Sequence, residues 1–438
     1  MTDQHASRSR RRLTATVTDL EVQVQRAFLV GVELPGMASV DAERSLEELS
    51  LLTETSGSDP VDMELVRRHQ LDPATYIGSG KAEELGSLTK ALDIDVVIFD
   101  NSLAPAQTRN LESIFQCDVV DREALILDIF AQHATTKIGA LQVELAMLRY
   151  NLPRLRGKGK SMSQQGFGVL ARGPGETKLE TDRRHTLARI SKLERELKDM
   201  AKHRETQRKA RKRNAIPQVS IVGYTNAGKS TLLNGLTDAG VKVRDQLFAT
   251  LDSTVRRLEV SNNRSVLVAD TVGFVRRLPH HLVDAFASTL AEVAEADLLL
   301  HVVDASEPDL VGQLAAVREV LLEIEADQIP ELLVFNKTDV LGPSQLERLE
   351  NLYPDACFVS ARKSVGLDTL VEEIGTHIER QMVNLNLTIP YHRGDIVAAA
   401  YRVGEVLGEQ HEGDGTHLEV RIPARDRSRF NGFEAGTS

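Results

Sequence analysis

The sequence predicts a multidomain α/β protein. A phosphate-loop (P-loop) domain with a parallel sheet is preceded by a small α/β domain and a helical hairpin, and followed by a small α+β domain. The chain has 438 residues, enough for about three domains. In two regions short apolar runs alternate with helical patterns, which is typical of parallel βαβ units. A glycine-rich motif at a strand–helix junction of the second region predicts the phosphate loop.

The predicted segments follow from changes in pattern along the chain. The first residues contain an arginine cluster without an apolar run behind it, so we expect a solvated tail rather than a signal peptide. The predicted bounds are 1–20 for the tail, 21–135 for the N-terminal α/β domain, 136–213 for the hairpin, 214–380 for the P-loop domain and 381–438 for the C-terminal α+β domain.

The N-terminal domain shows short apolar runs separated by helical patterns. RAFLVGVE and DVVIFD are typical of buried strands, and leucines at helical spacing follow the first of them. This alternation predicts a small parallel sheet. In order, we expect a strand at 26–33, a helix at 39–55, a turn and helix at 78–92, a strand at 95–100, a helix at 104–115 and a strand at 117–121.

Two further helical patterns predict the hairpin. One runs from residue 122 to 150 and is closed by Pro153; the other runs from 178 to 213, beyond a glycine-rich loop at 157–177. We expect their apolar stripes to pack together. The stripe residues are Leu141, Leu145 and Leu148 in the first helix and Ile190, Leu193, Leu197 and Met200 in the second.

Charge is distributed unevenly along the chain. The net charge is −11, but residues 149–213 contain 20 Lys and Arg against 7 Asp and Glu, a local net charge of +13. The remainder of the chain therefore has a net charge of −24. This separation predicts a basic element that meets a polyanion, although many basic helix faces are only solvated.

Composition excludes some classes of protein. Cys117 and Cys357 are the only cysteines and have neither CxxC spacing nor histidine clusters beside them, which excludes a disulfide framework and argues against a zinc site. No apolar run approaches ~18 residues, which argues against a membrane span. The cysteine usage fits the reducing cytosol.

The strongest motif is VSIVGYTNAGKSTLLNGL at 219–236, which satisfies G-x-x-x-x-G-K-[ST]. It lies between a predicted strand and a predicted helix, so backbone N–H groups and a helix N-terminus would surround phosphates. Lys229 would reach the β- and γ-phosphates and the Ser230 hydroxyl would bind Mg²⁺, whereas a simple turn needs neither side chain. The predicted phosphate-loop residues are Gly223, Tyr224, Thr225, Asn226, Ala227, Gly228, Lys229, Ser230 and Thr231.

A second motif follows the strand VLVAD at 266–270. Asp270 would hold Mg²⁺ through water, and the Gly273 N–H would reach the γ-phosphate. The next residue is Phe274, where many nucleotide switches use Gln to orient the attacking water. Because a phenyl ring cannot orient water, we expect slow intrinsic hydrolysis. A backbone group, Arg276 or Arg277, or a group from elsewhere would then complete the site. The expected binding residues are Asp270, Thr271, Val272 and Gly273, while Arg276 and Arg277 are expected to face solvent.

A third motif, NKTD at 336–339, begins at the last residue of the strand at 332–336 and predicts which nucleotide base is bound. Asp339 would accept hydrogen bonds from two guanine N–H groups, and adenine offers no matching pair, so GTP is favoured over ATP. Asn336 would bridge to the phosphate loop and the Lys337 stem would cover the base. The expected residues are Asn336, Lys337, Thr338 and Asp339, with Ser360, Ala361 and Arg362 meeting the guanine oxygen through their backbone.

A loop before the second motif should carry a threonine that closes on Mg²⁺ when GTP is bound. Thr250 and Thr254 are the candidates, and we favour Thr250 because Thr254 begins the predicted strand TVRRLEV. The expected nucleotide-binding residues of this loop are Phe248, Ala249, Thr250, Leu251 and Asp252.

The motifs resemble those of the Obg–HflX superfamily of translation-factor-related GTPases, and specifically the HflX family. Segments outside the P-loop domain carry the resemblance as well, so that it covers roughly residues 70–365 strongly. The similar segments are FATLD (248–252), DTVGF (270–274), NKTD (336–339), YIGSGKAEEL (76–85), LQVELAMLRYNLPRL (141–155) and RGPGETKLETDRR (172–184).

The resemblance implies a cytoplasmic, Mg²⁺-dependent GTPase that hydrolyses GTP to GDP and phosphate. It implies binding to the large (50S) ribosomal subunit and its rRNA, with the hairpin loop reaching toward the peptidyl-transferase region, and the splitting or rescue of stalled or idle ribosomes. We favour the ribosome as the activator that completes the site at Phe274. We expect a monomer and leave peripheral membrane association open. The catalytic residues would be Lys229, Thr250 and Gly273, and the Mg²⁺ ligands Ser230 and Thr250.

Alternatives remain at this point. The chain would be a GTP-gated RNA-binding module if hydrolysis were negligible, or a metabolic kinase with an ATP site, against which Asp339 argues. In the N-terminal domain, Gly78-x-Gly80 and Lys81 precede a helix and suggest a second phosphate site for ATP or RNA. Without a Walker pattern, we favour a tight turn at a helix start.

Overall fold

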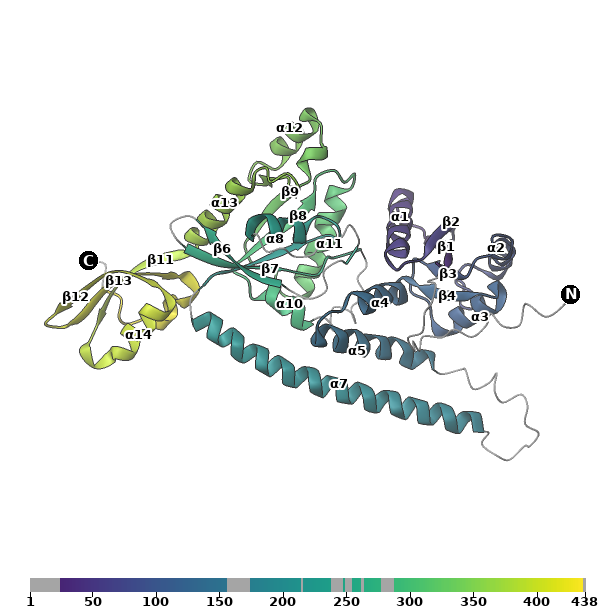
Figure 1. Cartoon of the computed structure of the whole chain (residues 1–438), viewed down its shortest axis with the longest axis horizontal. Helices are drawn as coiled ribbons and strands as arrows, with labels where there is room; N and C mark the ends of the chain where they lie inside the picture. Colours follow the sequence, from purple (N-terminus) through teal and green to yellow (C-terminus); the bar gives the residue numbers. More distant parts are fainter. Residues whose placement is uncertain are drawn as a thin grey trace. The chain divides into compact units, whose positions relative to one another are not determined.

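The computed structural model describes residues 24–155, 174–213, 216–237, 247–248, 254–260, 264–276 and 287–435. The chain divides into two compact units, Met1–Val120 and Asp121–Ser438. The predicted fold class is confirmed: a mixed α/β chain contains a mainly parallel six-stranded sheet and a C-terminal antiparallel sheet (Figure 1). Among the described residues, no helix is both long and apolar enough to cross a membrane.

The first unit contains a four-stranded sheet in the order β2-β1-β3-β4, with β1 parallel to both of its neighbours. Apolar residues such as Val30 and Phe99 in the strands pack with Leu111 of a helix to form its core. All six predicted elements are present, together with β2, which was not predicted. The elements are β1 Arg26–Glu33, α1 Ser39–Thr55, β2 Asp59–Arg67, α2 Ser79–Ala91, β3 Val96–Phe99, α3 Pro105–Phe115 and β4 Asp118–Asp121.

The helix predicted at 122–150 is in fact two helices, α4 Arg122–His133 and α5 Lys137–Arg154. The chain breaks at Thr136, whose hydroxyl oxygen accepts a backbone N–H of the first turn of α5 at 3.1 Å. α5 extends through Pro153, which lies in its last turn instead of ending it. Local capping chemistry therefore overrides a helical pattern that is continuous in the sequence.

The predicted packing between the two stripes is confirmed. α5 lies against the long helix α7 Pro174–Arg213, and the apolar residues of both stripes form one cluster. Removal of these side chains from water is the main stabilising term for a pair of helices whose other faces are charged. The buried members are Leu141, Leu145, Ile190 and Leu193, and the partly buried ones are Leu148, Leu152, Leu197 and Met200.

Asp121 joins the start of α4 to the end of α5. Its buried carboxylate accepts the Ala124 N–H at 2.9 Å as the N-cap of α4. The same carboxylate accepts the Tyr150 hydroxyl at 2.8 Å and pairs with Arg154 at 3.0 Å. Burial and the nearby Asp121 charge raise the pKa of Tyr150, so this phenol stays protonated and donates. The root of the glycine-rich loop is thereby fixed to α4.

The central sheet has the order β10-β9-β8-β5-β7-β6, and all pairs are parallel except β6 with β7. The inner strands, such as β8, are mostly apolar because helices cover both faces of the sheet, whereas the edge strand β6 contains exposed charged residues. The elements are β5 Gln218–Gly223, α8 Lys229–Thr237, β6 Thr254–Val260, β7 Arg264–Asp270, α10 Ala287–Ala294, β8 Leu298–Asp304, α11 Leu310–Glu323, β9 Glu331–Asn336, α12 Pro343–Leu352, β10 Cys357–Phe358 and α13 Leu367–Arg380.

The C-terminal part is a three-stranded antiparallel sheet in the order β11-β13-β12 with one helix packed on it. Its core contains residues of the strands, such as Leu387 and Val420, with Val403 of the helix. This matches the predicted helix between strands. The elements are β11 Met382–Ile389, α14 Gly394–Val403, β12 Glu405–Glu412 and β13 Gly415–Pro423.

Candidate nucleotide site

The predicted motifs meet at one edge of the central sheet. β5 ends at Gly223, β7 at Asp270 and β9 at Asn336, and the carboxyl ends of these parallel strands lie at the same edge of the sheet, with β8 between β9 and β5. Ligands of open α/β sheets bind at this edge. Topology alone therefore brings together motifs that lie far apart in the sequence.

Lys229 begins α8 and lies inside the phosphate loop. Its ammonium group is buried and donates to the carbonyl oxygens of Gly223 at 3.1 Å and Tyr224 at 2.7 Å. Burial lowers the pKa of Lys229 to about 8, and the nearby Asp270 charge opposes this shift. Gly228 before it has φ +90°, a conformation that side chains rarely adopt, and its α-carbon lies against the Asn336 side chain.

Ser230 and Asp270 provide the oxygen atoms expected of a magnesium site. The Ser230 hydroxyl donates to Asp270 Oδ2 at 2.5 Å, and the Asp270 carboxylate is fully buried. Hydroxyl and carboxylate oxygens are ligands that Mg²⁺ prefers, so the residues present fit this ion. Thr271, the next residue, donates its hydroxyl to the Ile221 carbonyl at 2.6 Å and fixes the end of β7 to β5.

Phe274 is buried in the domain and does not occupy the exposed position of a water-orienting Gln. The ring is buried, and its backbone forms a bridge with the phosphate loop: Phe274 N–H donates to Gly223 O at 3.1 Å, and Thr225 N–H donates to Phe274 O at 2.8 Å. The side chain is therefore part of the packing between the two motifs. Gly273 is held against the loop, and an ideal Cβ on it would lie 3.0 Å from Lys229 Nζ.

We expect Phe274→Gln to destabilise this domain without supplying a water-orienting group. A buried amide in place of the ring loses apolar burial and gains a desolvated polar group, at a cost of about 2–4 kcal/mol. The free energy of unfolding is measured by denaturant titration, and the transition of this domain is recognised as the one that GTP shifts. Phe274→Leu is the conservative comparison. A stable Phe274→Gln variant that hydrolyses GTP faster than the parent would contradict this account.

The NKTD segment shows the bridge to the phosphate loop that was expected of Asn336. Its amide Nδ2 donates to the Ala227 carbonyl at 2.9 Å, and its Oδ1 accepts the Ala361 N–H at 3.0 Å. The Ser360 hydroxyl donates to Asp339 Oδ1 at 2.7 Å, and this hydrogen bond lowers the pKa of Asp339, with a smaller effect from Lys363. Asp339 is therefore ionised at neutral pH, as an acceptor for two N–H donors must be.

The position of the Lys337 side chain is fixed by its left-handed backbone conformation and by an ion pair with Asp304. Its φ is +62°, and its ammonium group lies 2.6 Å from Asp304 Oδ2. Arg362 is exposed beside Ala361, while Thr338 donates its N–H to the Val359 carbonyl at 3.2 Å. These contacts fix the backbone after β9, although the role of each residue in binding the base stays a prediction.

The loop before β6 is described only in part. Phe248 is buried with φ +55°, and its ring meets Phe130 of α4 edge-on with 4.6 Å between centroids. Thr254 is the first residue of β6, as expected. Four predicted residues lie outside the described part of the chain: Ala249, Thr250, Leu251 and Asp252.

Arg276 differs from its prediction, whereas Arg277 lies outside the described residues. Instead of facing solvent, Arg276 forms an ion pair with Asp309, the N-cap of α11, and its side chain is 20% exposed. Asp309 belongs to a distant segment of the chain that contains none of the three nucleotide-binding motifs. Spacing along the sequence could not have indicated this contact.

The turn before α2 has the contacts of a structural element. Lys81 pairs with Glu64 of β2 and with Glu84 one turn along its own helix at 2.8 Å. The Arg68 guanidinium group lies against Gly78, which has φ +84°. These contacts support the tight turn over a second phosphate site.

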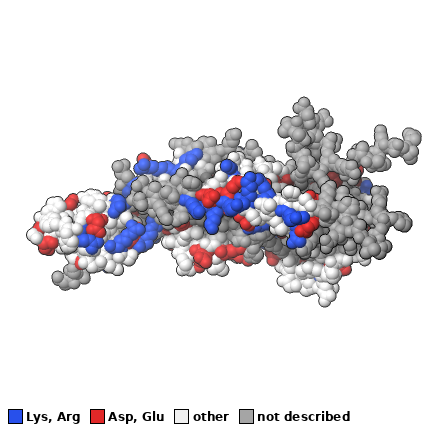
Figure 2. Space-filling view, turned by 90° about the horizontal axis from the view of Figure 1, so that it is seen from below, with Lys and Arg blue, Asp and Glu red and all other residues white. Residues whose placement is uncertain are grey.

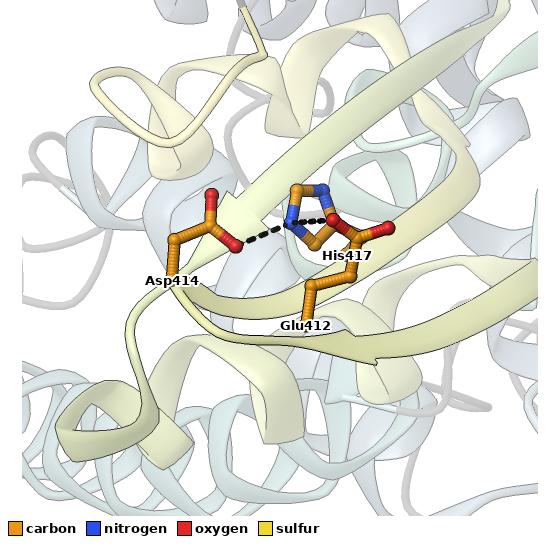
Figure 3. A group of neighbouring side chains, drawn as sticks. All are labelled: Glu412, Asp414 and His417. Carbon is orange, nitrogen blue, oxygen red and sulfur yellow. Dashed lines mark hydrogen bonds and ion pairs between the residues drawn. The ribbon is translucent and has the colours of Figure 1, made fainter.

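A separate group of side chains lies at the turn between β12 and β13 (Figure 3). His417 Nε2 lies 2.8 Å from Asp414 Oδ1 and 3.8 Å from Glu412 Oε2, and the His417 pKa is raised by the hydrogen bond to Asp414. Both carboxylates are exposed. An exposed ion-pair cluster accounts for this arrangement without a metal.

Comparison with known sequences identifies the family. Three family models match the chain: "GTP-binding GTPase N-terminal" at residues 43–131, "GTP-binding GTPase Middle Region" at 133–211 and "50S ribosome-binding GTPase" at 218–337. GTPase HflX of Caldanaerobacter subterraneus subsp. tengcongensis is 42% identical over 409 residues, covering 93% of this chain and 94% of that protein. The chain belongs to the HflX family of GTPases.

The Escherichia coli relative agrees with this assignment. GTPase HflX of Escherichia coli is 42% identical over 388 residues, covering 88% of this chain and 91% of that protein. A crystal structure of a GTP-binding protein from Sulfolobus solfataricus in complex with GDP aligns over 81% of this chain and 98% of its own, with 26% identity and a TM-score of 0.42. As a member of the HflX family, this chain is a GTPase that binds guanine nucleotides.

Proposed function

We propose that this HflX-family GTPase binds the large ribosomal subunit in the cytoplasm and uses GTP hydrolysis to split stalled or idle ribosomes. The observation that carries the proposal is the match of residues 218–337 to a model described as a 50S ribosome-binding GTPase. The net charge of +13 between residues 149 and 213 supports rRNA as the partner. Family membership favours hydrolysis over a GTP-gated binding module.

At the nucleotide, we propose Lys229, Thr250 and Gly273 as the catalytic groups. Lys229 and the Gly273 N–H stabilise charge on the γ-phosphate, and Thr250 closes on Mg²⁺. Ser230 and Thr250 bind the ion directly, while Asp270 holds it through water. The hydrogen bond of the partly buried Ser230 to the buried Asp270 and the packing of Gly273 against Lys229 support these roles.

The hairpin presents its cations on an exposed face. Figure 2 shows Lys and Arg side chains along the face that carries α7, with acidic side chains between them. Shape and phosphate contacts would dominate recognition, since few aromatic residues occur in this segment. The exposed cations within the described part of α7 are Arg184, Lys192, Arg195, Lys198 and Lys202.

Arg154, at the end of α5 before the glycine-rich loop, has a structural role. Arg154 pairs with the buried Asp121, and its guanidinium group lies 3.4 Å from the centroid of the Tyr150 ring. Charge reversal at Arg154 would leave Asp121 buried beside a second negative charge and would destabilise the hairpin. It is therefore unsuitable for testing RNA binding.

We expect reversal of three loop cations to weaken binding to the large subunit by 10-fold or more, because each loses a phosphate contact and adds repulsion. GTP affinity should stay within twofold, since the loop belongs to a different part of the chain. Binding of the variant loaded with a GTP analogue is measured against separated ribosomal subunits at fixed salt. The substitutions are Arg156→Glu, Lys158→Glu and Lys160→Glu.

The control changes the net charge by the same amount at exposed sites elsewhere. If both triple variants lose ribosome affinity equally, general repulsion explains the loss and the hairpin has no specific role. If neither loses affinity, the rRNA proposal fails. In a separate measurement, a rate of phosphate release that does not change when large subunits are added would show that the ribosome is not the activator. The control substitutions are Lys90→Glu, Arg348→Glu and Arg380→Glu.

A further inference from the structure

Arg276, three residues beyond Gly273, is held at three points by three different elements. We propose that it is a positioning residue for GTP hydrolysis. In this proposal the Arg276 anchor, formed by Tyr224, Asp309 and Arg122, keeps Gly273 at its place against the phosphate loop. The inference rests on the proposed role of the Gly273 N–H and requires nothing of the ribosome.

The first contact comes from the phosphate loop itself. The Arg276 backbone N–H donates to the Tyr224 hydroxyl oxygen at 2.8 Å. The Tyr224 side chain is buried, and its backbone forms the parallel bridge with Phe274. The loop therefore holds the segment after Gly273 by its main chain at Phe274 and by a side chain at Arg276.

The second contact fixes the side chain of Arg276. Its guanidinium group pairs with Asp309 Oδ2, while Asp309 Oδ1 accepts the Gly312 N–H at 3.3 Å and caps α11. The carboxylate is thus held at a helix start, where its position is set by the backbone. Both charged groups are about four-fifths shielded from solvent, so the pair is less screened than a surface ion pair.

The third contact comes from outside the P-loop domain. Arg122 begins α4, is 3% exposed and donates to the Arg276 carbonyl oxygen at 3.4 Å. α4 also reaches the other loop beside the nucleotide, through the ring contact of Phe130 with Phe248. One helix therefore contacts a residue of each segment expected to close on GTP.

The geometry at Gly273 explains why this position matters. An ideal Cβ there would lie 2.8 Å from Thr225 Cγ2 and 3.0 Å from Lys229 Nζ, so the segment has no spare space. A small displacement of Arg276 changes the distance between the Gly273 N–H and the γ-phosphate. Catalytic donors act on the transition state only when they are held close to their working positions.

The test uses single-atom changes to two members of the anchor in the full-length protein, without ribosomes. Tyr224→Phe removes only the hydroxyl that accepts the Arg276 N–H, and Asp309→Asn keeps the helix cap but removes the charge. We expect each to lower kcat roughly 3- to 10-fold, the worth of one hydrogen bond, while KM for GTP stays within twofold. Because both act on Arg276, the double variant should lose less than the product of the two effects.

Tyr401→Phe is the matched control. It removes a phenolic hydroxyl that donates to Glu409 in the C-terminal part, and kcat should not change. Equal kcat in parent and Tyr224→Phe overturns the proposal, as does a rise in KM alone, which would indicate a binding role. Independent, fully multiplicative effects of the two anchor variants would show that they do not act through a shared residue. Loss of ribosome stimulation alone, with basal kcat unchanged, would also reject the anchor while leaving the ribosome proposal intact.

Discussion

Lys229→Ala is expected to lower kcat for GTP hydrolysis by roughly 10²- to 10³-fold, the loss typical of one preorganised charged donor. The effect is large because the ammonium group is buried and held by two carbonyl oxygens, so that little reorganisation is needed at phosphate. Its pKa of about 8 leaves most of the group charged at pH 7. Phosphate release under single-turnover conditions measures the chemical step separately from binding.

Lys202→Ala serves as the comparison for Lys229→Ala. Lys202 is a solvent-exposed lysine of α7, paired with Asp199 at 3.6 Å, and its removal should leave hydrolysis unchanged. If Lys229→Ala retained activity within tenfold of the parent, another cation would have to stabilise the γ-phosphate. The assignment of this loop as the catalytic one would then be wrong.

Asp339→Asn is expected to weaken GTP binding by roughly 10²-fold or more and to improve binding of xanthosine triphosphate. The carboxylate accepts two guanine N–H groups in our assignment, and hydrogen bonds to a charged acceptor are worth about 1.5–3 kcal/mol each. An amide offers a donor instead, which matches the second carbonyl oxygen of xanthine. Competition between the two triphosphates, measured by calorimetry, reports the change.

The control for Asp339→Asn is Asp327→Asn, the same substitution at an exposed position of the domain. It should leave both affinities as they are in the parent. Equal loss of both triphosphates in Asp339→Asn would indicate local unfolding. Unchanged preference for GTP would show that another residue reads the base.

Much of this fold could be predicted because its signals are local. Each motif of the P-loop domain follows an apolar strand, and parallel topology brings such strand ends together, so the Asn336 contact with Ala227 was expected. The stripes ending in Leu148 and Met200 were likewise visible in the sequence, because helical periodicity reports one buried face.

Other features depend on partners that sequence spacing does not reveal. β2 was not predicted because its segment DPVDMELVR has no clear alternation and Val66 is its only buried residue. The break before α5 is accompanied by an extended Ala134 and by the Thr136 cap, and neither is signalled by the helical pattern. Burial of Phe274 and the ion pair of Arg276 with Asp309 arise from contacts between distant segments, and a motif cannot specify these.

The side chain of Asn336 touches both the phosphate loop at Ala227 and the backbone N–H of Ala361, where we propose that guanine binds. The two halves of the site therefore share one rigid amide, and ordering one half reduces the entropy still to be lost by the other. In thermodynamic terms, the free energy of GTP binding should not equal the sum for guanosine and triphosphate measured separately. Selectivity for the base and affinity for the phosphates would then be energetically coupled through one side chain.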